Sequence, residues 1–383
     1  MNFVASYCEI TRVSGILNLY LSKKQAQQTR KTPLANYRKM VENNNMKTII
    51  KRTYTIVALL LISVIFAVSC SPRNLDAQQV SAPETPAVPQ SGQENNTAPV
   101  VYFTSRITSE GLMAVYNALG REANGKVAVK LHTGEPGNRH FLSPNLIKDL
   151  VQKVNGTIVE ANTVYGGRRA STAAHYEVAR EHGFTAIAPV VIMDEKSEIS
   201  LPVTGGKHLK ENFVGARFTD FNFHIVLSHF KGHQMGGFGG ALKNLSIGYA
   251  SSAGKAWIHS AGKSKTRPFG GDQNNFLESM AEAAKTVIDA NSGRMIYINV
   301  MNHLSVDCDC NGNPTAPTMK DIGILASLDP VALDQACVDL VYKAPDGGDL
   351  IQRIESRNGL LTIKRAQEIG IGSKEYQLKL IDG

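Results

Sequence analysis

From Val100 onward, short apolar runs alternate with longer stretches in which apolar residues recur every three or four positions. Buried strands produce the first pattern, and helices with one apolar face produce the second. Strands are predicted at residues 127–132, 156–162, 222–228, 294–301 and 323–328. Helices are predicted at 143–154, 171–183, 274–291 and 329–343. This alternation indicates an α/β fold with a mainly parallel sheet and flanking helices, either as one unit or as two subdomains sharing a central cleft.

The ends of the predicted helices carry recognisable signals. Ser143 and Asp329 each precede a proline, which suits an N-cap followed by proline at the first helical position. Gly183 follows a helical stretch and is expected to end it. Within the last helix, Asp334 is expected on a solvated face and Cys337 as a small buried residue.

Polar side chains gather in the loops that follow four of the predicted strands. These loops are His132–Pro144, Glu160–Arg169, Ser228–Gly248 and Asn302–Pro314. The third, SHFKGHQMGGFGGALKNLSIG, combines many glycines with His229, His233, Lys243 and Asn244. In parallel sheets, ligands bind beyond the carboxyl ends of the strands, so these loops are expected to form the functional site.

The first quarter of the chain contains a predicted targeting segment. A basic segment beginning at Met46 leads into the apolar run Ile56–Val68, which ends in AVSC. This resembles a bacterial lipoprotein signal with Cys70 as the lipidated residue, and an uncleaved anchor helix is the alternative. We therefore divide the chain into an over-extended start (1–45), a signal peptide (46–69), a flexible tether (70–99) and an α/β domain (100–383). The predicted location is the cell envelope, on the periplasmic or outer-membrane side, with the lipid as the membrane contact.

The net charge of +8 does not point to a nucleic-acid partner. Ten of the 41 Lys and Arg residues precede Cys70, but only two of the 33 acidic residues do, so 31 of each kind remain afterwards. A domain without excess positive charge lacks the electrostatic footprint of a nucleic-acid-binding protein.

Three cysteines remain after Cys8 and Cys70 are set aside. An odd number, with Cys308 and Cys310 one residue apart in DCDC, does not indicate a disulfide framework. The C-x-C pair could supply two ligands of a metal or cluster, act as a redox pair, or consist of two unrelated cysteines.

The motifs together resemble the DUF362 family. They are KLHTGEPGN, EANTVYGGRR, the glycine-rich loop, DCDC and DIGILASLDPVALDQACVDL. Many relatives carry a ferredoxin-like insertion with two C-x-x-C-x-x-C-x-x-x-C runs, but the corresponding region here, His259–Phe276, has no cysteine. The resemblance therefore implies an iron–sulfur site only through Cys308 and Cys310.

The glycine-rich loop is also similar to the core of nickel-dependent lactate racemases. His233, Lys243 and His259 reproduce that family's intervals of ten and sixteen residues. The resemblance implies a proton-transfer base at His233, a cofactor-holding lysine at Lys243 and a nickel ligand at His259. It further implies a second base in an earlier loop, at His140 with His132 behind it.

Two functions follow as hypotheses. The first is a metal-dependent enzyme that performs redox or proton-transfer chemistry on a small carboxylate. Its catalytic residues would be His233, His140 and Lys243, and its substrate would lie against Arg168, Arg169 and Asn244. Its metal, in an iron–sulfur, nickel or zinc site, would be held by ligands from His229, His233, His259, Cys308 and Cys310. The second function is a non-catalytic module that binds a small anion or a metal.

Overall fold

The computed structural model describes residues 98–291 and 293–382. The start at 1–45, the signal at 46–69, Cys70 and most of the tether lie outside the described residues. In the part that is described, no helix has both the length and the apolar character needed to cross a bilayer.

One eight-stranded sheet organises the domain, in the order β12-β1-β11-β10-β7-β2-β3-β4. Its strands are β1 (Val100–Thr104), β2 (Val127–Lys130), β3 (Thr157–Glu160), β4 (Val190–Ile192), β7 (Phe223–His229), β10 (Met295–Met301), β11 (Gly323–Ser327) and β12 (Gln377–Leu380). Only β11 is antiparallel to its neighbours, so the other seven strands run in one direction. The predicted α/β fold with a mainly parallel sheet is therefore confirmed, as a single unit and not as two subdomains.

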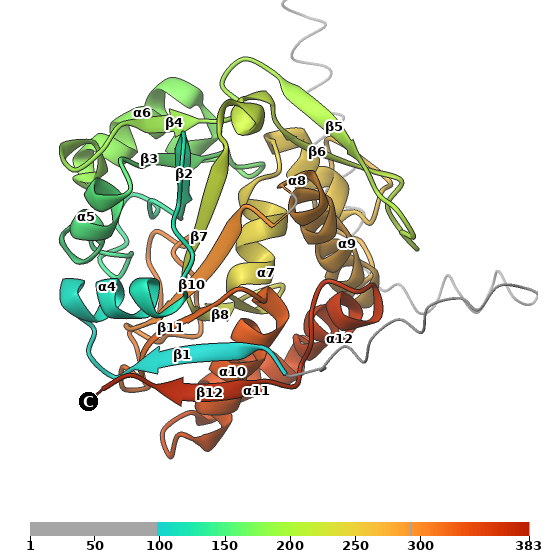
Figure 1. Cartoon of the computed structure of the whole chain (residues 1–383). Helices are drawn as coiled ribbons and strands as arrows, with labels where there is room; N and C mark the ends of the chain where they lie inside the picture. Colours follow the sequence, from blue (N-terminus) through green and yellow to red (C-terminus); the bar gives the residue numbers. More distant parts are fainter. Residues whose placement is uncertain (1–97, 292, 383) are drawn as a thin grey trace, which may run out of the picture. The chain divides into compact units, whose positions relative to one another are not determined.

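Helices cover both faces of this sheet (Figure 1). Alternating strand residues divide the core: Val129 and Leu227 pack with one group of helices, whereas Ala128 and Val226 pack with the other. The first group contains α4 (Ser109–Ala118) and α5 (Pro144–Lys153). The second contains α7 (Ala241–Lys243), α9 (Gln273–Asn291), α10 (Pro330–Lys343), α11 (Gly348–Ser356) and α12 (Leu360–Glu368).

Smaller elements complete the described chain. Two antiparallel hairpins pair β5 (Glu198–Pro202) with β6 (Glu211–Gly215) and β8 (Lys231–His233) with β9 (Gly237–Gly239). The remaining helices are α6 (Thr172–Glu181) and α8 (Ser252–His259). Short 3₁₀ turns lie at η1 (Arg168–Ala170), η2 (Phe184–Ala186) and η3 (Ala216–Asp220), and a π-helical turn at η4 (Asn244–Gly248).

The predicted helix ends are found where the sequence placed them, but one residue inside a helix is not where it was expected. Asp329 caps α10 by accepting from the backbone N–H groups of Val331 and Ala332, and Gly183 follows α6 with a φ of 86°. Asp334, expected on a solvated face, is fully buried instead. Its carboxylate accepts the N–H groups of Ala241 and Leu242, and so it holds the start of α7 against α10.

Candidate functional site

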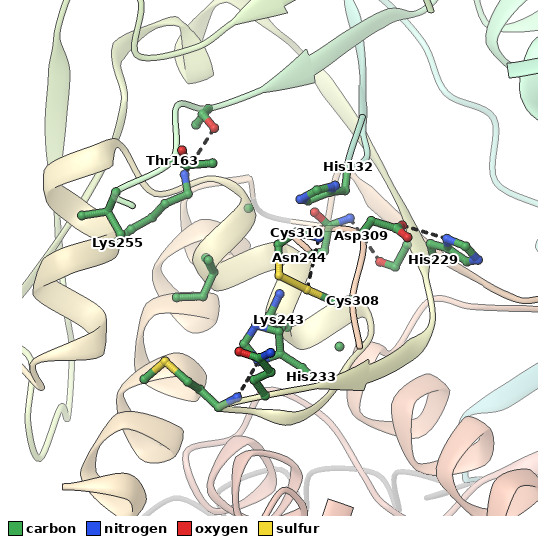
Figure 2. Close-up of a pocket in the computed structure, with 18 of the residues that line it drawn as sticks. His132, Thr163, His229, His233, Lys243, Asn244, Lys255, Cys308, Asp309 and Cys310 are labelled. Carbon is green, nitrogen blue, oxygen red and sulfur yellow. Dashed lines mark hydrogen bonds and ion pairs between the residues drawn. A yellow bond between two sulfur atoms is a disulfide. The ribbon is translucent and has the colours of Figure 1, made fainter. Parts of the chain in front are cut away.

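The four strands whose following loops were singled out lie side by side in the sheet. They run in parallel in the order β10-β7-β2-β3, so their carboxyl ends meet at one edge. A cavity of about 300 Å³ lies at this edge, where Figure 2 draws its lining side chains. The cavity lies where parallel α/β sheets place their ligands, and its lining comes from all four loops.

The glycine-rich loop forms much of the cavity wall because its backbone packs where side chains would not fit. A Cβ on Gly232 would lie 2.4 Å from the carbonyl oxygen of Val306, which leads into the DCDC segment. A Cβ on Gly240 would lie 2.3 Å from a carboxylate oxygen of Asp334. Both glycines thus let neighbouring segments approach closely, and Lys243 follows at the end of α7.

Positive charge dominates the cavity. Its lining contains four lysines and an arginine but only two carboxylates, those of Glu160 and Asp309. The cations are Lys130, Lys231, Lys243, Lys255 and Arg169. Such a surface favours a negatively charged ligand.

Lys243 is the cation best placed to meet that ligand. Among the described residues its ammonium group has no hydrogen-bond or ion-pair partner, whereas the other four cations all have one. Burial lowers the pKa of Lys243 to about 8, and the nearby charge of Lys130 contributes to the shift. Burial also lowers the pKa of Lys255 to about 7, but its ammonium donates to the carbonyl oxygens of Ala250 and Ala161.

A buried ion cluster forms another part of the cavity wall. Glu160 at the end of β3 accepts from Lys130 at 3.2 Å and from Arg169 at 2.8 Å, and Arg169 also pairs with Glu135 at 3.0 Å. Burial alone would raise the pKa of Glu160, but the two cations hold it well below the usual value. Because these charges satisfy one another, the cluster positions the loops and leaves Lys243 free for a ligand.

His132 lies against this cluster and does not carry a positive charge. Its Nε2 faces Nη1 of Arg169 at 2.8 Å, and its Nδ1 accepts the Gly134 N–H at 3.0 Å. Burial, followed by the charge of Arg169, lowers the pKa of His132 well below its ordinary value.

A second ion cluster fixes the DCDC segment. Asp309 accepts from Nδ1 of His229 at 2.8 Å and from Lys231 at 2.9 Å. The other ring nitrogen of His229 faces the carbonyl oxygen of Asn302 at 2.8 Å. A carbonyl and a carboxylate both accept, so both ring nitrogens of His229 donate and neither is open to a metal ion.

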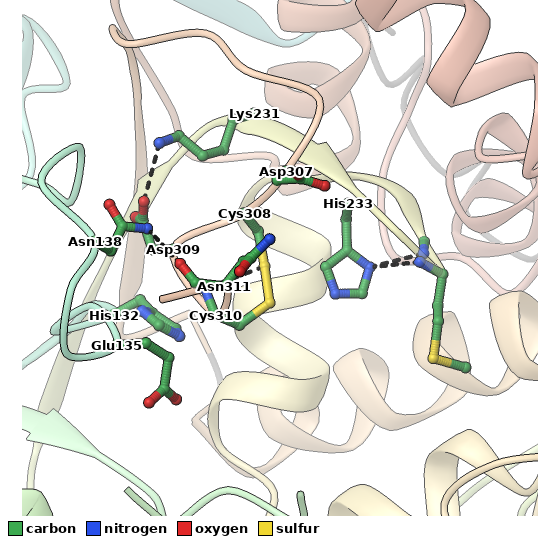
Figure 3. Close-up of a disulfide and its surroundings, with 12 residues drawn as sticks. His132, Glu135, Asn138, Lys231, His233, Asp307, Cys308, Asp309, Cys310 and Asn311 are labelled. Carbon is green, nitrogen blue, oxygen red and sulfur yellow. Dashed lines mark hydrogen bonds and ion pairs between the residues drawn. A yellow bond between two sulfur atoms is a disulfide. The ribbon is translucent and has the colours of Figure 1, made fainter. Parts of the chain in front are cut away.

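Cys308 and Cys310 are joined by a disulfide in the cavity wall. A disulfide is the oxidised form that the redox alternative requires, whereas the metal alternative requires the reduced form. Cys308 is 9% exposed, and Cys310 is the more exposed of the two. Figure 3 shows the ring of His233 beside the two sulfur atoms.

His233, Cys308 and Cys310 also form a group that could hold a metal ion. One ring nitrogen of His233 and the two sulfur atoms all lie within 4.8 Å of one another. Thiolates bind metal ions and disulfide sulfurs do so poorly, so this group requires reduced cysteines. Neither His229 nor His259 belongs to it.

The other residues expected at the site divide into those in the cavity and those outside it. Asn244 lines the cavity and donates to the carbonyl oxygens of Lys130 and Leu227, so it ties the loop to two strands. His259 also lines the cavity. His140 and Arg168 do not: the His140 ring lies tilted against that of His303, and Arg168 makes a bidentate pair with Glu181 on the surface.

Several residues of the site were not singled out from the sequence. Lys130 and Glu160 are the last residues of β2 and β3, and Lys231 and Asp309 stand between predicted ligands. A charged residue ending an otherwise apolar parallel strand is the signal that could have identified the first two. Lys255 on α8 gave no such signal.

Comparisons with known proteins agree with the family resemblance. The model of a family described as a domain of unknown function (DUF362) matches residues 127–339, more than half of the chain. No curated protein sequence matches.

Two solved structures are similar at low identity. One is the lactate racemase apoprotein from Thermoanaerobacterium thermosaccharolyticum, at 14% identity, a TM-score of 0.39, and coverage of 66% of this chain and 59% of that one. The other is a protein from Thermotoga maritima, at 12% identity, a TM-score of 0.35, and coverage of 68% and 58%. This chain thus spans less than two thirds of either structure, and at these TM-scores neither likeness supports a statement about activity.

Proposed function

This chain belongs to the DUF362 family, and we propose that it is an enzyme of the cell envelope that exchanges electrons with a small anionic thiol through the Cys308–Cys310 disulfide. The observation that carries the proposal is that the disulfide and the unpaired ammonium group of Lys243 line the same cavity. Figure 2 draws both among the side chains that line it.

The chemistry of a disulfide determines the class of substrate. A disulfide reacts with a thiolate, which attacks one sulfur while the other leaves. The cations of the cavity favour a substrate with a negative charge, and Lys243 can pair with its carboxylate. A thiol that carries a carboxylate combines both requirements.

The half-reaction between the substrate and the protein disulfide balances in atoms and electrons. The substrate thiolate bonds to the more exposed Cys310 Sγ, the bond between the two cysteines breaks, and Cys308 leaves as a thiolate. The Cys310 N–H, which lies 3.3 Å from Cys308 Sγ, stabilises that thiolate. A second substrate thiolate releases the substrate disulfide and leaves both cysteines reduced, so two thiols are oxidised for each protein disulfide. Another disulfide restores the oxidised pair.

The predicted location supports this chemistry. Disulfides persist in the oxidising compartments outside the cytoplasm. We propose that the segment ending at Cys70 exports the chain and that a lipid on Cys70 attaches it to the membrane.

Rates of disulfide opening test the proposal. In full-length protein, we expect 3-mercaptopropionate to open the disulfide roughly tenfold faster, per thiolate, than neutral 2-mercaptoethanol, because the cavity attracts the carboxylate. A Lys243→Met variant should lose most of this preference. In a Cys308→Ser variant given the disulfide of 3-mercaptopropionate, the Cys310 thiolate should displace one 3-mercaptopropionate and keep the other as a mixed disulfide, which mass spectrometry detects.

Equal rates for the two thiols would contradict the anionic substrate. Binding of 3-mercaptopropionate without exchange would contradict the enzyme and favour the non-catalytic binding module.

A metal site is the second candidate, because the three ligand atoms of His233, Cys308 and Cys310 lie so close together. Two thiolates and an imidazole suit zinc, nickel or an iron–sulfur centre. The test is elemental analysis after anaerobic phosphine reduction and addition of zinc, beside a Cys308→Ser/Cys310→Ser variant. Stoichiometric zinc that requires both cysteines would favour this candidate, and the absence of zinc from the reduced protein would exclude a zinc site.

A further inference from the structure

Two cavity histidines have their protonation fixed by backbone groups. The Nδ1 atom of His233 faces the N–H groups of Gly236 at 2.8 Å and Met235 at 3.2 Å. The Nδ1 atom of His259 faces the carbonyl oxygen of Lys255 at 2.7 Å. A backbone N–H can only donate and a carbonyl can only accept, so with the rings in these orientations the contacts define which nitrogen of each ring carries the proton.

The contacts give the two rings opposite tautomers. In His233, Nδ1 must be unprotonated to accept two N–H groups, so the single proton of the neutral ring lies on Nε2. In His259, Nδ1 must carry the proton to donate to Lys255, so Nε2 keeps a lone pair. Burial lowers the pKa of both rings, to about 4 for His259, which keeps them neutral.

Both Nε2 atoms are open to a ligand. His233 and His259 line the cavity, are 8% and 9% exposed, and make no other hydrogen bond at Nε2 within the described residues. Each ring is also held in place: the His233 ring by its two backbone donors, and the His259 ring by stacking on Phe276 at 4.6 Å. Figure 3 shows the His233 ring bonded to backbone on one side while its other nitrogen makes no bond to the residues drawn.

We infer that Nε2–H of His233 is a fixed hydrogen-bond donor of the cavity and that Nε2 of His259 is its fixed hydrogen-bond and proton acceptor. These roles differ from those that the resemblance implied, in which His233 was the proton-transfer base and His259 a nickel ligand. A metal ion could bind Nε2 of His233 only if its proton moved to Nδ1, where it would meet two N–H groups. The His233–Cys308–Cys310 group therefore needs a turned His233 ring as well as reduced cysteines before it can hold a metal.

The two nitrogens narrow the class of ligand. It should offer an acceptor to His233, a donor to His259, and a negative charge to Lys243. A small carboxylate with a hydroxyl or thiol group satisfies all three. The inference rests on the backbone contacts and the burial of both rings. If the proposed function also holds, His259 receives the thiol proton of the substrate.

The tautomers can be measured in the ligand-free protein. Full-length protein with ¹⁵N-labelled histidine should show, by long-range ¹H–¹⁵N correlation at neutral pH, His233 protonated only on Nε2 and His259 only on Nδ1. His233→Asn and His259→Asn variants assign the signals. A doubly protonated ring, or the same tautomer in both rings, would overturn the inference. The tautomers do not depend on disulfide exchange, so an experiment that contradicts the proposed function would not contradict this inference.

The same two variants test the roles toward a ligand. Asparagine at 233 keeps an oxygen for the two N–H groups, and asparagine at 259 keeps an N–H for Lys255, but each removes the nitrogen that faces the cavity. The probes are 3-hydroxypropionate and its methyl ether, and neither reacts with disulfides. The ether lacks the hydroxyl group that would donate to His259.

The wild type should bind the hydroxyl probe about three- to tenfold more tightly than the ether, the usual effect of one hydrogen bond. His259→Asn should abolish this preference. His233→Asn should weaken the binding of both probes by a similar factor, so the preference for the hydroxyl probe should remain. A preference that survives in His259→Asn would overturn the acceptor role, and one lost only in His233→Asn would overturn the donor role. The spectra decide between the tautomers even if neither probe binds.

Discussion

Within the described part of the chain, Lys243 is an unpaired cation inside a cavity, and such groups cost stability unless a ligand offsets the cost. Replacing Lys243 by methionine should therefore leave the free energy of unfolding unchanged or higher. It should weaken propionate binding by about tenfold, the usual loss for a charge-assisted hydrogen bond. Calorimetry and urea denaturation of the two proteins measure both effects. A clear loss of stability would show that Lys243 has a structural role.

The affinity for carboxylates should depend on pH through the same lysine. Lysine is charged below its pKa, and the pKa of Lys243 is lowered to about 8. Binding should be strongest below this value and fall as the pH rises through it, by about tenfold between pH 7 and pH 9. Propionate is a suitable probe because its own charge is constant in this range. The Lys243→Met variant should give a flat profile, and a matching slope in that variant would assign the titration to another group.

Two neighbouring arginines show what could not be predicted from the sequence for single residues. Arg168 and Arg169 looked equivalent, yet Arg168 is on the surface and Arg169 is buried against Glu160. The difference arises from the short 3₁₀ turn η1, which directs consecutive side chains to different sides. The sequence indicated the loop and the charge but not which guanidinium would face inward. For the same reason it included His140 and Arg168, which the fold places outside the cavity.

At the scale of elements, the position of α7 depends on a contact between a glycine and a buried carboxylate. A Gly240→Ala substitution would push a methyl group into Asp334 and should destabilise the protein by about 1–3 kcal/mol, as overpacking typically does. Gly348→Ala is the matched control, since nothing lies within 4 Å of its added Cβ. Urea denaturation of both variants measures the difference, and equal stabilities would refute this account of α7.

The DCDC segment should stay in place without its disulfide. The ring closed by Cys308 and Cys310 is short, and its loss costs only about 1.6 kcal/mol in the chain-entropy account of a three-residue loop. Asp309 and Asp307 are held independently by Lys231 and Arg353. A Cys308→Ser/Cys310→Ser variant should thus unfold at nearly the wild-type urea concentration. A much larger loss would make the disulfide a structural one.

Most of the central elements could be predicted from periodicity. The five predicted strands and four predicted helices are all present, because each has a clear apolar pattern. The strands β1 and β12 were not predicted: β1 directly follows the polar tether, and β12 is exposed along its whole length. The antiparallel insertion of β11 is a matter of long-range pairing, which local patterns do not encode.

For the whole molecule, the main prediction concerns its attachment. If Cys70 carries a lipid, the mature protein begins at Cys70 and partitions into the membrane fraction. Mass spectrometry of its N-terminal peptide should show a diacylated cysteine. A Cys70→Ser variant should retain the uncleaved segment before it. A mature N-terminus elsewhere would contradict the lipobox interpretation.

The two ends of the domain meet in the sheet, where β1 lies between β12 and β11 (Figure 1). A hydrogen bond between Ser327 and Val100 joins residues that are 227 positions apart, and the partner of β1 on its other side is β12. A nascent chain emerging from the ribosome therefore carries β1 with neither neighbour until synthesis is nearly finished. Contacts of such long range form slowly. The part of the sheet around β1 can thus be assembled only after nearly the whole chain has been synthesised.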